Sequence, residues 1–303
     1  MKILVTGGAG FIGSNLACEL VKLGHEVVVL DSFFLGSMDN LASVKDKVKV
    51  VKGDIRKEED VMKAAEGVNV IFNEAAASSS PMFKDDLRGS VAANVDGFVN
   101  ILNAARKNDA EVIYASTSSV YGNNPPPLKE DMKINPPNFY AATKFAGEHL
   151  SAVFTSEYGV KTIGFRYMSV YGPREESKKT FANLVSQFLW SMQKDEAPVI
   201  YGDGKQTRDF TYVADVVQAN ILAMDANIKH DIFNVGTAKA TSINEMIDIL
   251  NKVLGKDIKP KYIETPVKNY ILTQLSDISK IKAALGFEPK YTLEQGIRAI
   301  LEG

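Results

Sequence analysis

The sequence has few of the residues that build disulfides and metal sites. Its 303 residues include one cysteine, Cys18, and three histidines, His25, His149 and His230. One cysteine excludes an internal disulfide, which suits a reducing cytoplasm. Because these residues lie far apart in the sequence, no metal-ligand spacing is present and we expect no bound metal. Cys18 falls on a predicted helix, where we interpret it as a core residue and not as a nucleophile.

An excess of one charge and long apolar runs are also missing. Lysine and arginine number 35 against 37 aspartates and glutamates, a net charge of −2, so nothing indicates binding to nucleic acid or to an anionic membrane. No apolar run is long enough to span a bilayer, and a predicted strand begins at once, leaving no room for a signal peptide. We therefore expect a cytoplasmic protein, and its 45% hydrophobic residues are ample for a sizeable core.

The N-terminal segment contains a glycine-rich turn. Residues 1–6 are typical of a buried strand. Gly7, Gly10 and Gly13 follow in the spacing G-x-x-G-x-x-G, and an amphipathic helix comes next. Strand, glycine turn and helix together favour a dinucleotide site, because small residues let backbone N–H groups approach a pyrophosphate at the positive end of a helix. The alternative is a tight connection in another kind of α/β protein.

Acidic residues follow the next two predicted strands. Asp31 comes after the strand at 26–30, about twenty residues past the glycines, where a carboxylate binds the adenosine ribose and repels a 2′-phosphate. Its position favours NAD over NADP, although it could simply end a strand. After the strand at 48–52, Asp54 and Ile55 would suit an adenine ring. Asp54 could equally be a turn residue or a helix cap.

Strands and helices alternate through the first part of the chain. The pattern predicts helices at 58–66 and 85–107 and strands at 68–72 and 111–115. This alternation favours βαβ units in a parallel, doubly wound sheet. Small residues after the strand at 68–72, including Ala75, leave space for a ligand beside the sheet.

A tyrosine–lysine pair follows the hydroxyl-rich segment 116–119. Tyr140 and Lys144 lie one turn apart on a predicted helix, so they share a face. Tyrosine has a reference pKa of about 10 and is a poor base at neutral pH, but an ammonium and a positively charged nicotinamide would each lower that pKa. The pair alone is common on ordinary helices. A hydroxyl-rich strand end and a dinucleotide turn before it favour a base activated by a nearby cation.

Together these stretches resemble the extended short-chain dehydrogenase/reductase family, in its NAD-dependent nucleotide-sugar epimerase branch. Further matching segments are 166–174, 201–215 and 233–237. The resemblance covers nearly the whole chain and implies an α/β fold in two parts. A Rossmann-type, doubly wound parallel sheet would occupy residues 1–170, and a smaller C-terminal α/β lobe at 171–303, partly interleaved with it, would bind a nucleoside-diphosphate sugar. A homodimer through the predicted helices at 85–107 and 141–158 is also implied.

The resemblance implies roles for single residues. Tyr140 would be the catalytic base, Lys144 would bind the nicotinamide ribose and lower the Tyr140 pKa, and Thr117 would hydrogen-bond the reacting hydroxyl. Ser118 is the alternative to Thr117. Arg208 would hold the substrate diphosphate through paired hydrogen bonds, unless it only pairs with a neighbouring aspartate. Further substrate contacts would come from Ser169, Asn183 and Lys268. The other cofactor contacts would come from Gly7, Gly10, Phe11, Ile12, Gly13, Asp31, Asp54, Ile55 and Ala75.

The triplet that begins at Thr117 separates possible reactions. In the dehydratases of this family, the corresponding triplet resembles Thr-Asp-Glu. This chain has Thr117, Ser118 and Ser119, so its triplet contains no carboxylate. The resemblance therefore implies 4-epimerisation of the UDP-glucose/UDP-galactose type, through a transient 4-keto sugar. The alternatives are an epimerase of UDP-uronic acids or UDP-N-acetylhexosamines, an NAD-dependent dehydrogenase or reductase, and a non-catalytic NAD-binding protein.

Several positions depart from the family pattern. Asn73 replaces a histidine and Ser169 replaces an asparagine that contacts the substrate phosphate. Val267 replaces an arginine, for which Lys268 could substitute only as a point charge. Gln274 falls near a position that governs tolerance of N-acetyl sugars. These departures leave the sugar and the nucleotide open.

The C-terminal part is predicted to contain short elements. We expect helices at 178–194, 213–225, 242–254, 277–285 and 292–301. The second of them should be capped near Asp215. Ser242 and Glu245 have the spacing of a capping box at the start of the third.

Overall fold

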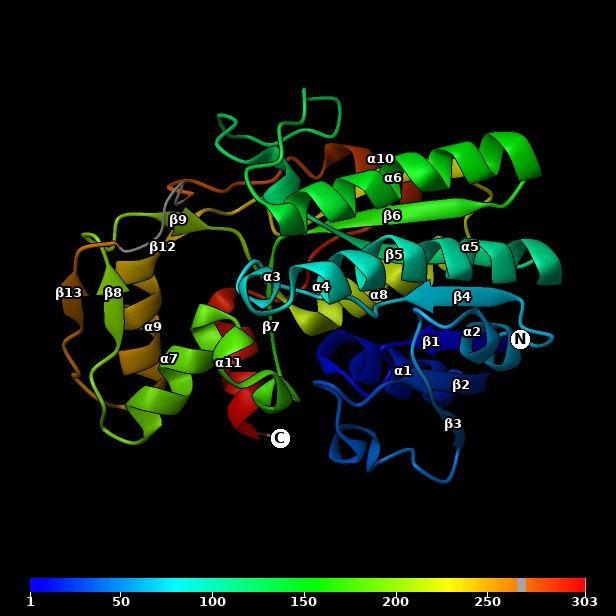
Figure 1. Cartoon of the computed structure of the whole chain (residues 1–303). Helices are drawn as coiled ribbons and strands as arrows, with labels where there is room; N and C mark the ends of the chain where they lie inside the picture. The colour runs from blue at the N-terminus through cyan, green and yellow to red at the C-terminus, as the bar shows by residue number, and fades with distance from the viewer. Residues whose placement is uncertain (266–270, 303) are drawn as a thin grey trace.

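A seven-stranded parallel sheet forms the centre of the molecule. The computed structural model describes residues 1–265 and 271–302 (Figure 1). Strand order in the sheet is β11-β6-β5-β4-β1-β2-β3, and every neighbouring pair is parallel. The strands are β1 (Lys2–Thr6), β2 (Glu26–Asp31), β3 (Val48–Lys52), β4 (Val70–Asn73), β5 (Glu111–Thr117), β6 (Thr162–Tyr167) and β11 (His230–Val235). The predicted α/β class with a Rossmann-type doubly wound sheet is confirmed.

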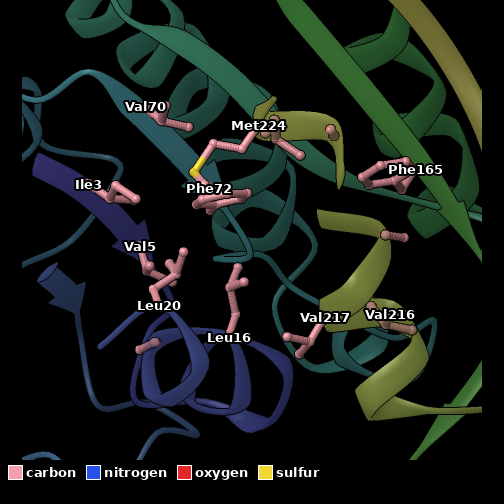
Figure 2. Close-up of a cluster of buried hydrophobic side chains, with 14 of the residues drawn as sticks. Ile3, Val5, Leu16, Leu20, Val70, Phe72, Phe165, Val216, Val217 and Met224 are labelled. Carbon is pink, nitrogen blue, oxygen red and sulfur yellow. The ribbon is translucent and has the colours of Figure 1, made fainter. Parts of the chain in front are cut away.

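Helices cover both faces of this sheet, which is why its inner strands are almost wholly apolar. On one face lie α1 (Phe11–Lys22) and α8 (Val213–Met224); on the other lie α2 (Glu58–Ala64), α5 (Asp96–Asn108) and α6 (Phe139–Tyr158). Figure 2 shows the first of these cores, where Leu16 of α1 and Met224 of α8 lie near Phe72 of the sheet. Cys18 is buried in the same core, as predicted.

The strand order reverses between β1 and β4. From β1 the chain proceeds outward to β2 and β3, and then crosses to β4 and β5 on the other side. In an open parallel sheet, the carboxyl ends of the strands at such a reversal form a crevice in which ligands bind. The glycine turn after β1 and the small residues after β4 meet at this point.

The C-terminal part forms a second core beside the sheet. It comprises η3 (Glu176–Phe181), α7 (Leu184–Gln193), β8 (Val199–Tyr201), α9 (Ile243–Leu254), β13 (Lys261–Ile263) and α11 (Leu293–Glu302). Val185, Met246 and Ile297 are buried together there. Short pairs join the parts: β7 (Ser169–Tyr171) with β10 (Phe210–Tyr212), and β9 (Thr207–Arg208) with β12 (Thr241–Ser242). Between these segments the chain returns to the main sheet as α8 and β11, and α10 (Ser279–Leu285) packs beside them.

Two predicted helices are interrupted. The helix expected at 85–107 is three helices, α3 (Met82–Asp85), α4 (Leu87–Asn94) and α5. Asp86 has extended φ and its side chain accepts from the Gly89 N–H, so it caps α4. The helix expected at 178–194 divides into η3 and α7, because Asn183 is extended and caps α7 through the Val185 N–H.

One predicted cap is correct and another is wrong. Ser242 and Glu245 form both hydrogen bonds of a capping box at the start of α9. Asp215 does not cap α8, which begins after Tyr212 without a side-chain cap. Its carboxylate instead accepts from the backbone N–H groups of Lys290 and Tyr291, and thereby ties α8 to the C-terminal segment.

Candidate active site

The carboxyl ends of the sheet strands open into a pocket of about 1050 Å³. Loops after β1 to β6 line one side, and Arg208, Ile271 and Gln274 come from the C-terminal part. The structure brings the predicted site residues together here, with one exception: Lys268, like Val267, lies outside the described residues. The lining includes Gly7, Gly10, Phe11, Ile12, Gly13, Asp31, Asp54, Ile55, Ala75, Thr117, Ser118, Tyr140, Lys144, Ser169, Asn183 and Arg208.

The glycine turn is closed by backbone contacts that exclude side chains. Gly7 has φ +65°, and a Cβ there would lie 2.7 Å from the Ala75 backbone nitrogen. A Cβ on Gly13 would lie 2.3 Å from the Gly7 carbonyl oxygen. Helix α1 begins next to this turn without a side-chain cap, and its first residues line the pocket. The turn therefore suits the pyrophosphate of a dinucleotide.

Asp31 is fixed at the end of β2 by the glycine turn itself. Its Oδ2 accepts from the Ala9 N–H at 2.9 Å and its Oδ1 from the Phe33 N–H at 2.7 Å. Burial raises the pKa of Asp31, and these backbone hydrogen bonds oppose the rise. Each oxygen retains a second lone pair, so the carboxylate can still accept from ribose hydroxyls.

Asp54 is a turn residue. Its Oδ1 accepts from the Arg56 N–H at 2.9 Å, and both carboxylate oxygens accept from the Arg56 guanidinium. This guanidinium holds the pKa of Asp54 below its usual value. Helix α2 begins after Lys57, so Asp54 is not its cap. The adenine role stays a prediction for Asp54 and for Ile55, which packs against Gly97 of α5.

Thr117 and Tyr140 meet at the end of β5. Thr117 is the last residue of that strand, and Tyr140 lies in the first turn of α6, whose cap is the Asn138 side chain. Burial raises the pKa of Tyr140, and a hydrogen bond with Thr117 opposes the rise. Tyr140 is therefore protonated at neutral pH in the protein alone. The lowered pKa implied by the family resemblance has to come from additional positive charge, such as a nicotinamide ring.

Lys144 lies one turn farther along α6 and lines the same pocket. Burial lowers its pKa to about 8, and the carboxylates of Glu74 and Glu148 oppose this effect. Glu74 and Tyr167 also line the pocket but were not among the predicted site residues. The signal in the sequence was a single charged residue, Glu74, within the small residues that follow β4.

Gln274 joins the two serines of the predicted substrate site. Its Nε2 donates to Ser118 Oγ at 2.6 Å, and its Oε1 accepts from Ser169 Oγ at 3.0 Å. Gln274 is buried. Its amide group therefore provides fixed polar atoms next to Ser118, the residue that follows Thr117. Asn183 uses its side-chain oxygen to cap α7, which leaves its NH₂ group for a ligand. Arg208 donates to the Thr207 carbonyl oxygen at 2.7 Å.

Comparison with known proteins identifies the family. Residues 3–236 match the model of the NAD dependent epimerase/dehydratase family. The chain belongs to this family. The family acts on nucleotide sugars and depends on NAD. Among the described residues no cluster of three or more metal-ligating side chains occurs, and no helix is long and apolar enough to cross a membrane.

Individual relatives in the family differ in reaction. The chain is 36% identical over 99% of its length to a putative UDP-glucose 4-epimerase of Methanocaldococcus jannaschii, covering 97% of that protein. It is 32% identical over 99% of its length to a UDP-N-acetyl-alpha-D-glucosaminuronate decarboxylase of Bacillus cytotoxicus, again covering 97%.

Solved structures in the family agree closely with this fold. The UDP-glucose 4-epimerase of Thermotoga maritima, crystallised with UDP-glucose, superimposes with a TM-score of 0.94 at 33% identity, covering 100% of this chain and 98% of that one. The UDP-glucuronic acid 4-epimerase of Bacillus cereus, in complex with UDP-glucuronic acid and NAD, gives 0.90 at 30% identity, with coverage of 100% and 98%.

Proposed function

We propose that the protein is an NAD-dependent nucleotide-sugar 4-epimerase of the UDP-glucose/UDP-galactose type. The observation that carries this proposal is the meeting of Thr117, Tyr140 and Lys144 in one pocket with the glycine turn. The absence of a carboxylate in the triplet Thr117–Ser119 supports epimerisation over dehydration, since elimination of water needs an additional acid and base.

The proposed mechanism divides the work between residues and cofactor. NAD bound at the glycine turn and Asp31 supplies the hydride acceptor and, later, the hydride donor. Thr117 orients the C4 hydroxyl of the sugar, and Tyr140 removes its proton as the 4-keto sugar forms. After the sugar turns over in the pocket and C4 is reduced from its opposite face, Tyr140 would return the proton to the C4 oxygen. Lys144 holds the cofactor ribose and supplies positive charge beside Tyr140.

The substrate side of the pocket supports a bound nucleoside diphosphate and an uncharged sugar. Arg208, on β9, provides the guanidinium for the diphosphate. The Ser118–Gln274–Ser169 chain supplies neutral polar groups beside Thr117. These hydroxyl and amide groups can donate to and accept from sugar hydroxyls, which supports a neutral hexose. Uronic acids, N-acetylhexosamines and other nucleotides remain the alternatives.

The test follows both sugar products and cofactor. Purified protein is incubated separately with UDP-glucose and UDP-galactose, products are separated by chromatography, and NADH absorbance is recorded. Interconversion without net NADH is expected. Net accumulation of NADH would instead identify a dehydrogenase. If neither sugar reacts, a panel of UDP-uronic acids, UDP-N-acetylhexosamines and GDP-, dTDP- and ADP-sugars decides between another epimerase and a non-catalytic NAD-binding protein.

We also propose that the protein is a cytoplasmic homodimer. Helices α5 and α6 lie side by side along one face of the sheet (Figure 1). On α6, Val153 and Tyr158 are exposed, with Arg106 of α5 placed 3.9 Å from the centre of the Tyr158 ring. A second copy covering these helices would remove the apolar side chains from water. The cytoplasmic location rests on the single cysteine.

A further inference from the structure

Glu74 is a charged residue in the part of the pocket where the sheet strands end. It follows β4 directly, and its N–H donates to the Thr6 carbonyl oxygen at 3.2 Å, so its backbone is held against β1. The next residue, Ala75, touches the glycine turn at Gly7. Glu74 therefore lies between the proposed cofactor turn and the proposed catalytic residues, in a position that the mechanism above does not use.

Two neighbouring elements hold the Glu74 carboxylate in place. Its Oε1 accepts from the Tyr167 hydroxyl at 2.9 Å, and that hydroxyl accepts from Asn220 Nδ2 at 2.8 Å. Asn220 is completely buried on α8, and its own Oδ1 has no hydrogen-bond partner. Asn220 Nδ2 also donates to the Val216 carbonyl oxygen at 2.9 Å, and this second hydrogen bond holds the amide in the orientation that donates to Tyr167.

Lys144 of α6 lines the same pocket as Glu74, and it shares a small second cavity with Asn73 and Ala75, the residues on either side of Glu74. The charges of Glu74 and Lys144 act on each other across the pocket. Glu148, the other carboxylate that acts on Lys144, is already engaged by the Arg166 guanidinium at 2.7 and 2.9 Å. Its charge is therefore largely balanced. Glu74 is the carboxylate whose charge is available to Lys144.

We propose that Glu74 is a positioning residue of this site: held by Tyr167, which Asn220 holds in turn, its carboxylate is the counter-ion of Lys144 and so maintains the cation that Tyr140 requires. This inference rests on the roles proposed above for Tyr140 and Lys144. Glu74 itself contacts neither the reacting hydroxyl nor the proton that moves. It acts through the charge of Lys144.

The pKa values place this interaction in the neutral range. Burial raises the pKa of Glu74 to about 7, opposed by the Tyr167 hydrogen bond and Lys144. Burial lowers the pKa of Lys144 to about 8, opposed by Glu74 and Glu148. Between these values both groups are charged, and above the Lys144 pKa the ammonium is lost. Without the Glu74 charge, the pKa of Lys144 falls and the ammonium is lost at lower pH.

The first test is the pH dependence of kcat/KM in wild type and Glu74→Gln. Glutamine is isosteric and still accepts from Tyr167, so it removes the charge and keeps the shape. We expect the basic limb of the profile to move down by about 1 pH unit. Asp85→Asn is the matched control: Asp85 lines the same pocket but is not among the carboxylates that act on Lys144, so its basic limb stays where the wild-type limb is. An unmoved basic limb in Glu74→Gln overturns the proposal.

A second test needs no turnover. Melting temperatures of wild type, Glu74→Gln, Lys144→Met and the double variant form a double-mutant cycle. We expect a stabilising coupling between the two positions at about pH 7.5 that disappears at about pH 5, where Glu74 is protonated. No coupling, or coupling independent of pH, overturns the inference. An inactive wild type that still shows this coupling overturns the proposed function instead.

Discussion

Tyr140 moves the proton in the proposed reaction, so its hydroxyl is the decisive single group. Tyr140→Phe keeps the ring that packs near Phe83, at a centroid distance of 6.2 Å. Because a positioned acid–base group contributes about 10²–10⁴-fold, we expect turnover to fall by at least that range while NAD binding is retained. Product chromatography and calorimetric titration with NAD measure the two quantities.

The matched control for this variant is Tyr262→Phe. Tyr262 is an exposed tyrosine on β13 whose hydroxyl donates to Asn244, and it is not among the pocket-lining residues. Its loss should leave turnover unchanged. Retained turnover in Tyr140→Phe would falsify the assignment of Tyr140 as the base.

Asp31 should determine the choice of dinucleotide. Replacing it with alanine leaves the Ala9 and Phe33 N–H groups without their acceptor and removes the charge that repels a 2′-phosphate. We expect NAD affinity to fall by about 10–100-fold, in line with about 1–3 kcal/mol for unpaired polar groups. NADP affinity should fall less or rise. Titration with both dinucleotides gives the ratio.

Asp31→Asn separates the two effects. Asparagine keeps the size and one acceptor oxygen, so the turn is less disturbed, but the negative charge is absent. The preference for NAD over NADP should therefore fall in both variants. An unchanged ratio would mean that Asp31 only shapes the turn.

The sequence predicted that residues close together in the chain share one site, and Tyr140 and Lys144 do line one pocket. Tyr140 and Lys144 are one helical turn apart, so their common face follows from helix geometry alone. Glu74 was not predicted, because its partner Tyr167 lies on another strand and Asn220 on a distant helix. Nothing in the spacing of these three residues shows that the fold brings them together.

Helix α6 positions Tyr140 and Lys144, and its first turn depends on Asn138. The Asn138 side chain accepts from the Ala141 N–H at 2.9 Å. Asn138→Ala should cost about 1 kcal/mol of the free energy of unfolding, which lowers the melting temperature by about 2–4 °C. Because Tyr140 lies in this turn, kcat should fall as well. Thermal melts and steady-state kinetics measure the two effects.

Helix α9 offers the matched control. Ser242→Ala removes an equivalent cap, since Ser242 Oγ accepts from the Glu245 N–H at 3.1 Å. Its effect on the melting temperature should be similar, and kcat should stay at the wild-type value. Equal losses of kcat in the two variants would show that Asn138 acts through overall stability and does not position Tyr140.

The sequence predicted the ends of a helix well only where the hydrophobic periodicity and a capping residue indicated the same position. The capping-box spacing at Ser242 located the start of α9. The region at 85–107 has apolar residues at helical spacing throughout, so periodicity alone indicated one helix. Asp86 interrupts it through its own side-chain cap, and the chain bends again at Val95, which has φ −108°. Such interruptions depend on local hydrogen bonds that compete with helix continuation.

At the scale of the whole molecule, the sequence predicted five of the seven strands of the sheet, but neither β6 nor β11. β11 pairs with β6 at the edge of the sheet, although the second core lies between them in the chain order. The segments 166–174 and 233–237 match family motifs, and no strand is predicted from the sequence at either. Strand order results from pairing between distant segments. The position of β11 in the sheet can therefore be predicted only when the position of its neighbour β6 is known.

The proposed dimer is a prediction about the whole assembly, and Val153 tests it. Val153 is 54% exposed in the C-terminal part of α6. We expect wild type to have the mass of a dimer by light scattering. A charge at the centre of the interface should be costly to desolvate, so Val153→Glu should be a monomer.

Leu23→Glu is the control for this variant, since Leu23 is 51% exposed at the end of α1, away from α5 and α6. It should remain dimeric. A single chain carries the glycine turn, Asp31 and Arg208 in one pocket, so the Val153→Glu monomer should retain nucleotide binding. A monomeric wild type contradicts the dimer outright. If Leu23→Glu dissociates and Val153→Glu does not, the interface lies on the α1 side of the sheet.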